Sequence, residues 1–184
     1  MLKRTLLSVC LIALLLVVQT QRVEATPVIS APFVTAAVGD TILIPISISD
    51  AADLAFFQFD LGFDALIVMA DLAGATAGAL LPADWFFTNP GIVDNVGGQI
   101  LGVSAFGSAI SGSGVIAYIE FKALSAGVSP LTFSNVFLNL SDQGFEVSNG
   151  QITVPEPTTL ALLIIGLMAF GARRQAARAW RHAA

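Results

Sequence analysis

The stretch LAFFQFDLGF, residues 54–63, decides the fold of this chain. From residue 57 onward every second residue is large and apolar, and polar residues or glycine stand between them. Successive side chains of a β-strand point to opposite faces, so this period of two predicts a strand with one buried face. The expected core side carries Phe57, Phe59, Leu61 and Phe63, and the opposite side carries Phe56, Gln58, Asp60 and Gly62.

The same alternation recurs on both sides of this stretch. Isoleucines occupy every second position from 42 to 48, and Pro45 on the other face predicts a free edge because proline cannot donate to a ladder. Further strands are predicted at 67–72, 99–106, 115–122, 131–140 and 145–154, with a turn at 94–98 and a flexible loop at 107–114. In the 115–122 strand we expect Val115, Ala117, Ile119 and Phe121 to face the core and Ile116, Tyr118, Glu120 and Lys122 to face outward.

Eight or nine short strands with glycine-rich turns predict an all-β fold. No stretch of the central region shows the pattern of a long amphipathic helix. Two sheets that each have one apolar face must cover each other, which favours a β-sandwich. Residues 26–154 are long enough for one domain with its own core.

The N-terminus has the pattern of a secretory signal peptide, residues 1–25. Lys3 and Arg4 precede an apolar run at 5–18, and small residues at 23–25 offer a cleavage site between Ala25 and Thr26. The alternative is a permanent first membrane helix.

The C-terminus, residues 155–184, combines an extended motif, an apolar run and arginines. Pro155, Glu156 and Pro157 cannot form a helix interior, so they are expected to be extended and accessible. The run at 160–172 holds 13 residues without charge, about 20 Å as a helix. The basic tail after it, with Arg173 and Arg174 first, is expected to stay cytoplasmic, which places everything before residue 154 outside.

Charge and residue types exclude several functions for the domain. Residues 26–154 hold eleven Asp or Glu residues against Lys122 alone, a formal charge of −10, so nucleic-acid binding is not expected. The one cysteine and the one histidine, Cys10 and His182, lie outside the domain, which argues against an imidazole-assisted nucleophile and against zinc. We therefore predict no enzyme, no metal site and no cofactor. Calcium stays open as a structural ion, although no Asp-x-Asp-x-Asp loop occurs.

The order of features at the C-terminus resembles the PEP-CTERM sorting signal of Gram-negative bacteria. The resemblance rests on Pro155-Glu156-Pro157, the short apolar run and the pair Arg173-Arg174 at the extreme end of the chain. It implies that an exosortase, a membrane-embedded cysteine transpeptidase, recognises and removes this tail in bacteria that make extracellular polysaccharide. The protein would be anchored transiently in the inner membrane and then reach the cell envelope, cell surface or extracellular matrix. An ordinary anchor that is never cut is the alternative.

The domain itself resembles the cohesin family across its whole length. The segments that carry the resemblance are VGDT at 38–41, FQFDLGFD at 57–64, VDN at 93–95, GVIAYIEFK at 114–122 and NGQITV at 149–154. The resemblance implies a nine-stranded jelly-roll sandwich that binds protein partners, typically dockerins, through one sheet face.

The sequence therefore predicts an exported, non-enzymatic module that binds a protein or an extracellular polysaccharide. The expected binding face carries Phe56, Gln58 and Asp60, with Tyr118 as a further candidate, because an outward aromatic ring beside hydrogen-bonding groups can anchor a partner. The alternative is a carbohydrate-active domain that binds sugars through Trp85 and Phe86. A weakly hydrolytic form of it would use two carboxylates, Asp60 with Asp64 or Asp50 with Asp53. Trp85 has a simpler interpretation as a plug at one end of the sandwich.

Overall fold

The computed structural model describes residues 25–139, 144–156, 162–163, 165 and 167–168. The described residues form ten strands: β1 Val28–Ser30, β2 Phe33–Thr35, β3 Thr41–Gly62, β4 Val68–Ala77, β5 Phe86–Asn89, β6 Ile92–Asp94, β7 Gln99–Ala123, β8 Gly127–Leu138, β9 Glu146–Ser148 and β10 Gly150–Val154. They build a β-sandwich, which confirms the predicted fold class.

Two strands are much longer than the sequence pattern predicts. β3 joins the predicted strands at 42–49 and 54–63, and β7 joins those at 99–106 and 115–122. The prediction of a flexible loop at 107–114 is wrong, because β7 continues through these residues and stays paired with β3. Both strands bend where the two predicted strands of each join, at residues 50–53 of β3. There the hydroxyls of Ser113 and Ser111 accept hydrogen bonds from the backbone N–H groups of Asp50 and Asp53, at 2.9 and 3.0 Å. These side chains replace ladder bonds where the register shifts.

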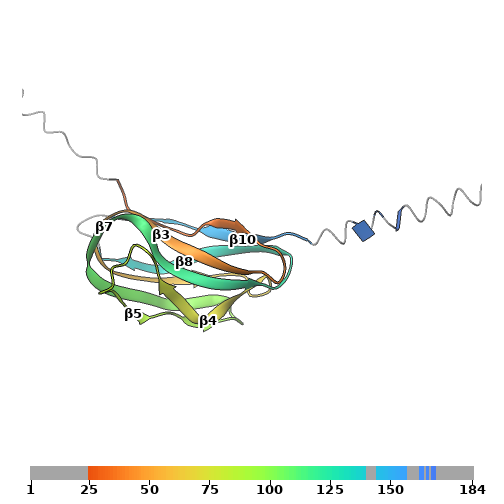
Figure 1. Cartoon of the computed structure of the whole chain (residues 1–184), viewed down its shortest axis with the longest axis horizontal. Helices are drawn as coiled ribbons and strands as arrows, with labels where there is room; N and C mark the ends of the chain where they lie inside the picture. The colour runs from red at the N-terminus through yellow and green to blue at the C-terminus, as the bar shows by residue number, and fades with distance from the viewer. Residues whose placement is uncertain (1–24, 140–143, 157–161, 164, 166, 169–184) are drawn as a thin grey trace, which may run out of the picture.

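The bend carries β3 and β7 from one layer of the sandwich into the other. One layer contains β10, β8, the second half of β3, the first half of β7, and β5 with β6. The other layer contains β9, β1, the first half of β3, the second half of β7, and β4. Figure 1 shows β7 curving round one end of the sandwich between the two layers. The short strand β2 extends the first layer by pairing in parallel with β10.

The core lies between the layers and follows the predicted alternation. Phe57, Phe59 and Leu61 are fully buried, and so are Ile44, Ile46, Ile119 and Phe121. Ile116, expected outside, is also fully buried. A bulge explains the difference, because Ile46 pairs with Ala117 and Ser47 with Val115, so one residue of β7 has no partner and the alternation changes there.

The two ends of the described domain lie at opposite ends of the sandwich. The chain enters near the bend of β7 and leaves after β10 at the other end (Figure 1). Most of the predicted sorting helix lies outside the described residues, and those described between 162 and 168 have helical backbone. In the part of the chain that the structure describes, no helix is long and apolar enough to cross a membrane.

Candidate functional site

Four phenylalanines from four neighbouring strands form a continuous row on the outer face of one layer. We call Phe137 of β8, Phe56 of β3, Phe106 of β7 and Phe86 of β5 the aromatic row. The ring centroids of Phe137 and Phe56 lie 5.8 Å apart, and those of Phe106 and Phe86 lie 6.3 Å apart. Phe56 and Phe106 are direct partners across the β3–β7 ladder, so the two ring pairs join in the middle of the sheet.

The aromatic row is open to solvent. Phe86 is 63% exposed, Phe137 57% and Phe106 47%, whereas Phe56 is half-buried between its neighbours. Single exposed apolar residues are common on protein surfaces, but a contiguous exposed patch marks an interaction site. The row is therefore a candidate interaction site.

Hydrogen-bonding groups and one carboxylate border the row. Gln58 stands next to Phe56 and is half-buried, and the hydroxyls of Thr88 and Ser104 bond each other at 2.8 Å. Near Phe86, the Asp84 carboxylate accepts the backbone N–H of Ser108 at 3.2 Å. Hydrogen bonds from the side chain and backbone of Ser108 hold the pKa of Asp84 below its ordinary value, so this border stays negative at neutral pH.

Asp60, predicted as part of the binding face, has a structural task. Its residue is 8% exposed, and its two carboxylate oxygens are both occupied. One accepts the backbone N–H of Gly102 in β7 at 2.6 Å, and the other accepts the side-chain amide of Asn135 in β8. Asp60 thus ties three strands of the same layer together, at the points where the β3–β7 and β3–β8 registers shift.

Asp60→Ala is expected to lower the free energy of unfolding by about 1–3 kcal/mol, because the N–H of Gly102 loses its acceptor in a part-buried position. Urea denaturation followed by tryptophan fluorescence measures the change. Glu120→Ala removes an exposed carboxylate from β7 and serves as the control, with little expected effect. Equal midpoints for the two variants would show that Asp60 does not hold the strands.

Trp85 does not contribute an exposed ring. It is 8% exposed, its ring stacks on Phe57 at 5.8 Å, and its indole N–H donates to the carbonyl of Ser108 at 2.9 Å. Gly107 lies against this ring so closely that a Cβ there would come within 2.3 Å of it. Trp85 is therefore a packing residue, and its neighbour Phe86 is the member of this segment that reaches the surface.

The remaining predicted residues lie away from the row. Tyr118 pairs with Pro45 and Thr76 in the other layer, so the structure does not bring it to Phe56. Ala25 and Thr26 are exposed before β1, and Pro155 and Glu156 are exposed directly after β10. Pro157, Arg173 and Arg174 lie outside the described residues.

Phe106 and Phe137 belong to the row but were not among the predicted site residues. Phe106 follows the buried Val103 and Ala105, so alternation from these two residues points to it, although the register shift between Ile100 and Val103 breaks the alternation earlier in the strand. Phe137 has no such signal, because alternation from Leu131 and Phe133 would place it inside. Asn135, with φ 48°, and the register shift beside it reverse the alternation, so that Leu138 is buried and Phe137 is exposed.

The chemistry available at the row is that of association. It offers aromatic rings, an amide and hydroxyls, groups that fill pockets and make hydrogen bonds at interfaces. Among the described residues, no group of three or more His, Cys, Asp or Glu is placed to hold a metal ion.

Comparison with known proteins assigns the fold to a family. The Cohesin domain model matches residues 27–154, and the PEP-CTERM protein-sorting motif matches residues 153–175. No curated protein matches the chain in sequence.

Several solved cohesins have a similar structure. A non-cellulosomal cohesin from the archaeon Archaeoglobus fulgidus is 17% identical, with a TM-score of 0.57 over 72% of this chain and 93% of that one. The third ScaC cohesin from Acetivibrio cellulolyticus, solved with the ScaB dockerin, is 18% identical, with a TM-score of 0.58 over 71% and 100%. The seventh ScaB type I cohesin from Pseudobacteroides cellulosolvens is 20% identical, with a TM-score of 0.58 over 72% and 94%. The chain belongs to the cohesin family and carries a PEP-CTERM protein-sorting motif directly behind its cohesin domain.

Proposed function

We propose that this protein is an exported, non-catalytic binding module that captures a protein partner through the aromatic row. The observation that carries the proposal is the contiguous exposure of Phe86, Phe106 and Phe137 on one sheet face. A few anchor residues, often aromatic, carry most of the binding energy at many interfaces, and the contacts around them exclude water. Solved relatives support this use, because several of them are complexes of a cohesin with a dockerin.

The electrostatics of the domain favour a partner with a basic rim. Residues 26–154 have a formal charge of −10, and Asp84 places a carboxylate at the Phe86 end of the row. A partner with an apolar centre and lysine or arginine around it would match both features. A dockerin-type module or another small envelope protein of this chemistry fits the proposal.

Affinity capture from an envelope extract tests the proposal with three forms of the protein. Phe106→Asp places a charge in the middle of the row, and we expect it to lose the specific partner. Met69→Asp is the matched control. Met69 is 40% exposed and pairs with Lys122 in the other layer, so this variant also replaces an exposed apolar side chain by aspartate, but away from the row. Both variants should melt like the wild type, because both positions are exposed. Identical partner lists for the wild type and Phe106→Asp would remove the row from consideration.

A carbohydrate ligand is the second candidate, and the exposed Phe86 and Phe106 rings are the observation that favours it. Flat rings can stack on sugars, although the buried Trp85 is not available for this. A glycan array separates the two functions. Binding to a neutral glycan that does not depend on salt and is lost in Phe86→Ala would support the carbohydrate function and contradict the protein-binding one. A basic protein partner, in contrast, should bind less tightly as the salt concentration rises.

We propose further that the C-terminal motif directs the protein to an exosortase. The order of Pro155-Glu156-Pro157, apolar run and arginines supports this, as does the match to the PEP-CTERM motif. The tail would hold the precursor in the inner membrane of a Gram-negative cell until it is cut, and the domain would then remain at the cell envelope, at the surface or in extracellular polymer.

Intact-mass spectrometry of envelope and medium fractions tests the export proposal. The mature protein is expected to begin at Thr26 and to lack residues 160–184. Replacing Pro155, Glu156 and Pro157 by alanine should leave the precursor in the inner membrane. If most molecules of the wild type keep the whole tail, the segment is a permanent anchor and not a sorting signal.

A further inference from the structure

Four exposed apolar residues lie on loops at the end of the sandwich where the chain leaves toward its C-terminal tail. Val96 is 95% exposed and Leu66 80%, and Val38 and Leu124 are 44% and 41% exposed. All four stand in turns or loops between strands, where polar residues are the common choice. We call them the apolar tips.

Backbone hydrogen bonds join the loops that carry the apolar tips into one continuous surface. The N–H of Gly39 donates to the carbonyl of Ala123, and the N–H of Leu124 donates to the carbonyl of Ile67, at 2.9 and 2.8 Å. The Ser125 hydroxyl donates to the carbonyl of Leu66 at 2.6 Å. On the other side of Leu66, the N–H of Phe63 donates to the carbonyl of Gly98 at 2.8 Å. The tips therefore lie side by side on one end of the molecule.

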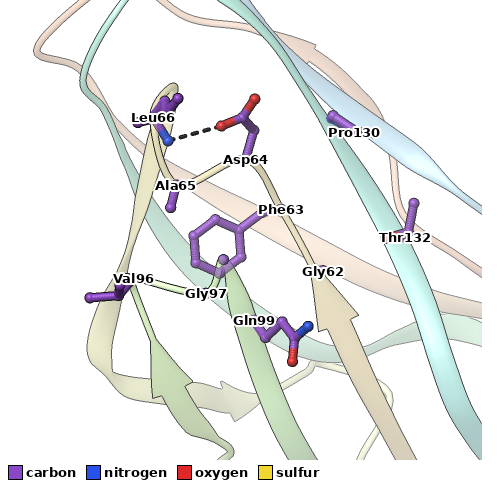
Figure 2. Close-up of a pocket in the computed structure, with 11 residues that line it drawn as sticks. Gly62, Phe63, Asp64, Ala65, Leu66, Val96, Gly97, Gln99, Pro130 and Thr132 are labelled. Carbon is purple, nitrogen blue, oxygen red and sulfur yellow. Dashed lines mark hydrogen bonds between the residues drawn. The ribbon is translucent and has the colours of Figure 1, made fainter.

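The two most exposed tips are held outward by the same local device. The carboxylate of Asp64 accepts the N–H of Leu66, and that of Asp94 accepts the N–H of Val96, each at 2.9 Å. Each aspartate fixes the turn and leaves the apolar side chain two residues later without cover. Figure 2 shows both side chains at the rim of a pocket of about 520 Å³, on the side away from Pro130 and Thr132.

The tail starts at this same end and almost without a linker. Val154 is 2% exposed and pairs with Gly127 as the last residue of β10. Pro155 and Glu156 follow at once and line a pocket of about 470 Å³ with the turn at residues 35–40, next to Val38. From Val154 to the first apolar residue of the tail, Leu160, an extended chain spans at most about 20 Å.

We propose that the apolar tips rest on the outer surface of the bilayer that holds the tail, so that the domain stands on the membrane through this end before processing. The proposal rests on the proposed membrane anchoring of the tail. With so short a connection, an anchored tail keeps this end within about 20 Å of the hydrocarbon core, and apolar loop residues gain free energy by entering the interface. The nearby carboxylates of Asp40, Asp64, Asp94 and Glu156 favour a zwitterionic lipid surface over an anionic one.

Fluorescence quenching in vesicles tests the proposal on the full chain. Cys10→Ser removes the native thiol, and Leu66→Cys then takes an environment-sensitive nitrobenzoxadiazole label at the tip. Ala109→Cys is the matched control, because Ala109 is exposed and precedes Ile110, which pairs with Leu54 beside the bend at the opposite end. The chains are reconstituted into phosphatidylcholine vesicles with and without doxyl-labelled lipid. Flotation, compared with that of a chain that lacks residues 160–184, reports whether the tail anchors them.

At position 66 we expect a blue-shifted spectrum and loss of about half of the emission to the doxyl lipid, because interfacial apolar groups lie roughly 5–10 Å into the headgroup region. At position 109 neither change is expected. Chains that float but show equal, weak quenching at both positions overturn this inference and leave the anchoring intact. Chains that do not float overturn both the anchoring and the inference that rests on it.

Discussion

Phe59→Ala is expected to lower the free energy of unfolding by about 3–5 kcal/mol, most of the margin of an ordinary domain. Phe59 is fully buried in the second half of β3. Its ring stacks on Phe57 with centroids 6.0 Å apart and meets Phe133 of β8 edge to face at 5.5 Å. Removing it leaves a cavity between the layers, and the surrounding strands are fixed by ladders on both sides and cannot close it.

The neighbouring Gln58→Ala is the control, because Gln58 lies on the outer face and is only half-buried. We expect it to change the free energy of unfolding by less than about 0.5 kcal/mol. Urea denaturation of both variants gives the comparison. If the two lose the same stability, the register of β3 is displaced by one residue and every assignment of a face on this strand changes with it.

The strand that contains Phe59 shows how far the sequence can predict this fold. Strict alternation at 57–63 indicates the core face correctly, because the register shifts beside this stretch insert their extra residues into β7 and β8 and leave β3 itself regular. The isoleucines at 44, 46 and 48 are buried for the same reason. Sandwich architecture then follows from several such half-apolar strands.

Alternation fails where a bulge inserts a residue. Alternation predicts Ile116 on the outer face and gives no outward signal for Phe137. Both predictions fail because each residue lies at a register shift that the sequence does not reveal. The bend at residues 50–53 is a similar case. Its continuity depends on serine hydroxyls 58 and 63 positions away in the chain, a contact that a local pattern cannot reveal.

The aromatic row depends on the same non-local information. Phe56 was a predicted site residue from its own strand, but its neighbours come from β5, β7 and β8, and only the pairing register sets them side by side. The register also separates Tyr118 from this face. Individual outward residues could thus be predicted from sequence, whereas their assembly into one surface could not.

Truncation of the middle of the row is expected to have the largest effect on partner binding. Phe106 pairs with both Phe56 and Phe86, so its removal interrupts the row at its centre. Truncating an anchor of this kind commonly costs about 2 kcal/mol or more of binding free energy. We therefore expect Phe106→Ala to raise the dissociation constant by a factor of about 30. Phe137→Ala, at the rim, should have a smaller effect.

The most direct test of the proposed function is the dissociation constant of the captured partner, measured by isothermal titration calorimetry. Wild type, Phe106→Ala and the control Met69→Ala are titrated at the same ionic strength, after equal melting temperatures have established that all three are folded. We predict an approximately 30-fold weaker complex for Phe106→Ala and an unchanged one for Met69→Ala. Equal dissociation constants for the wild type and Phe106→Ala would contradict binding through the aromatic row.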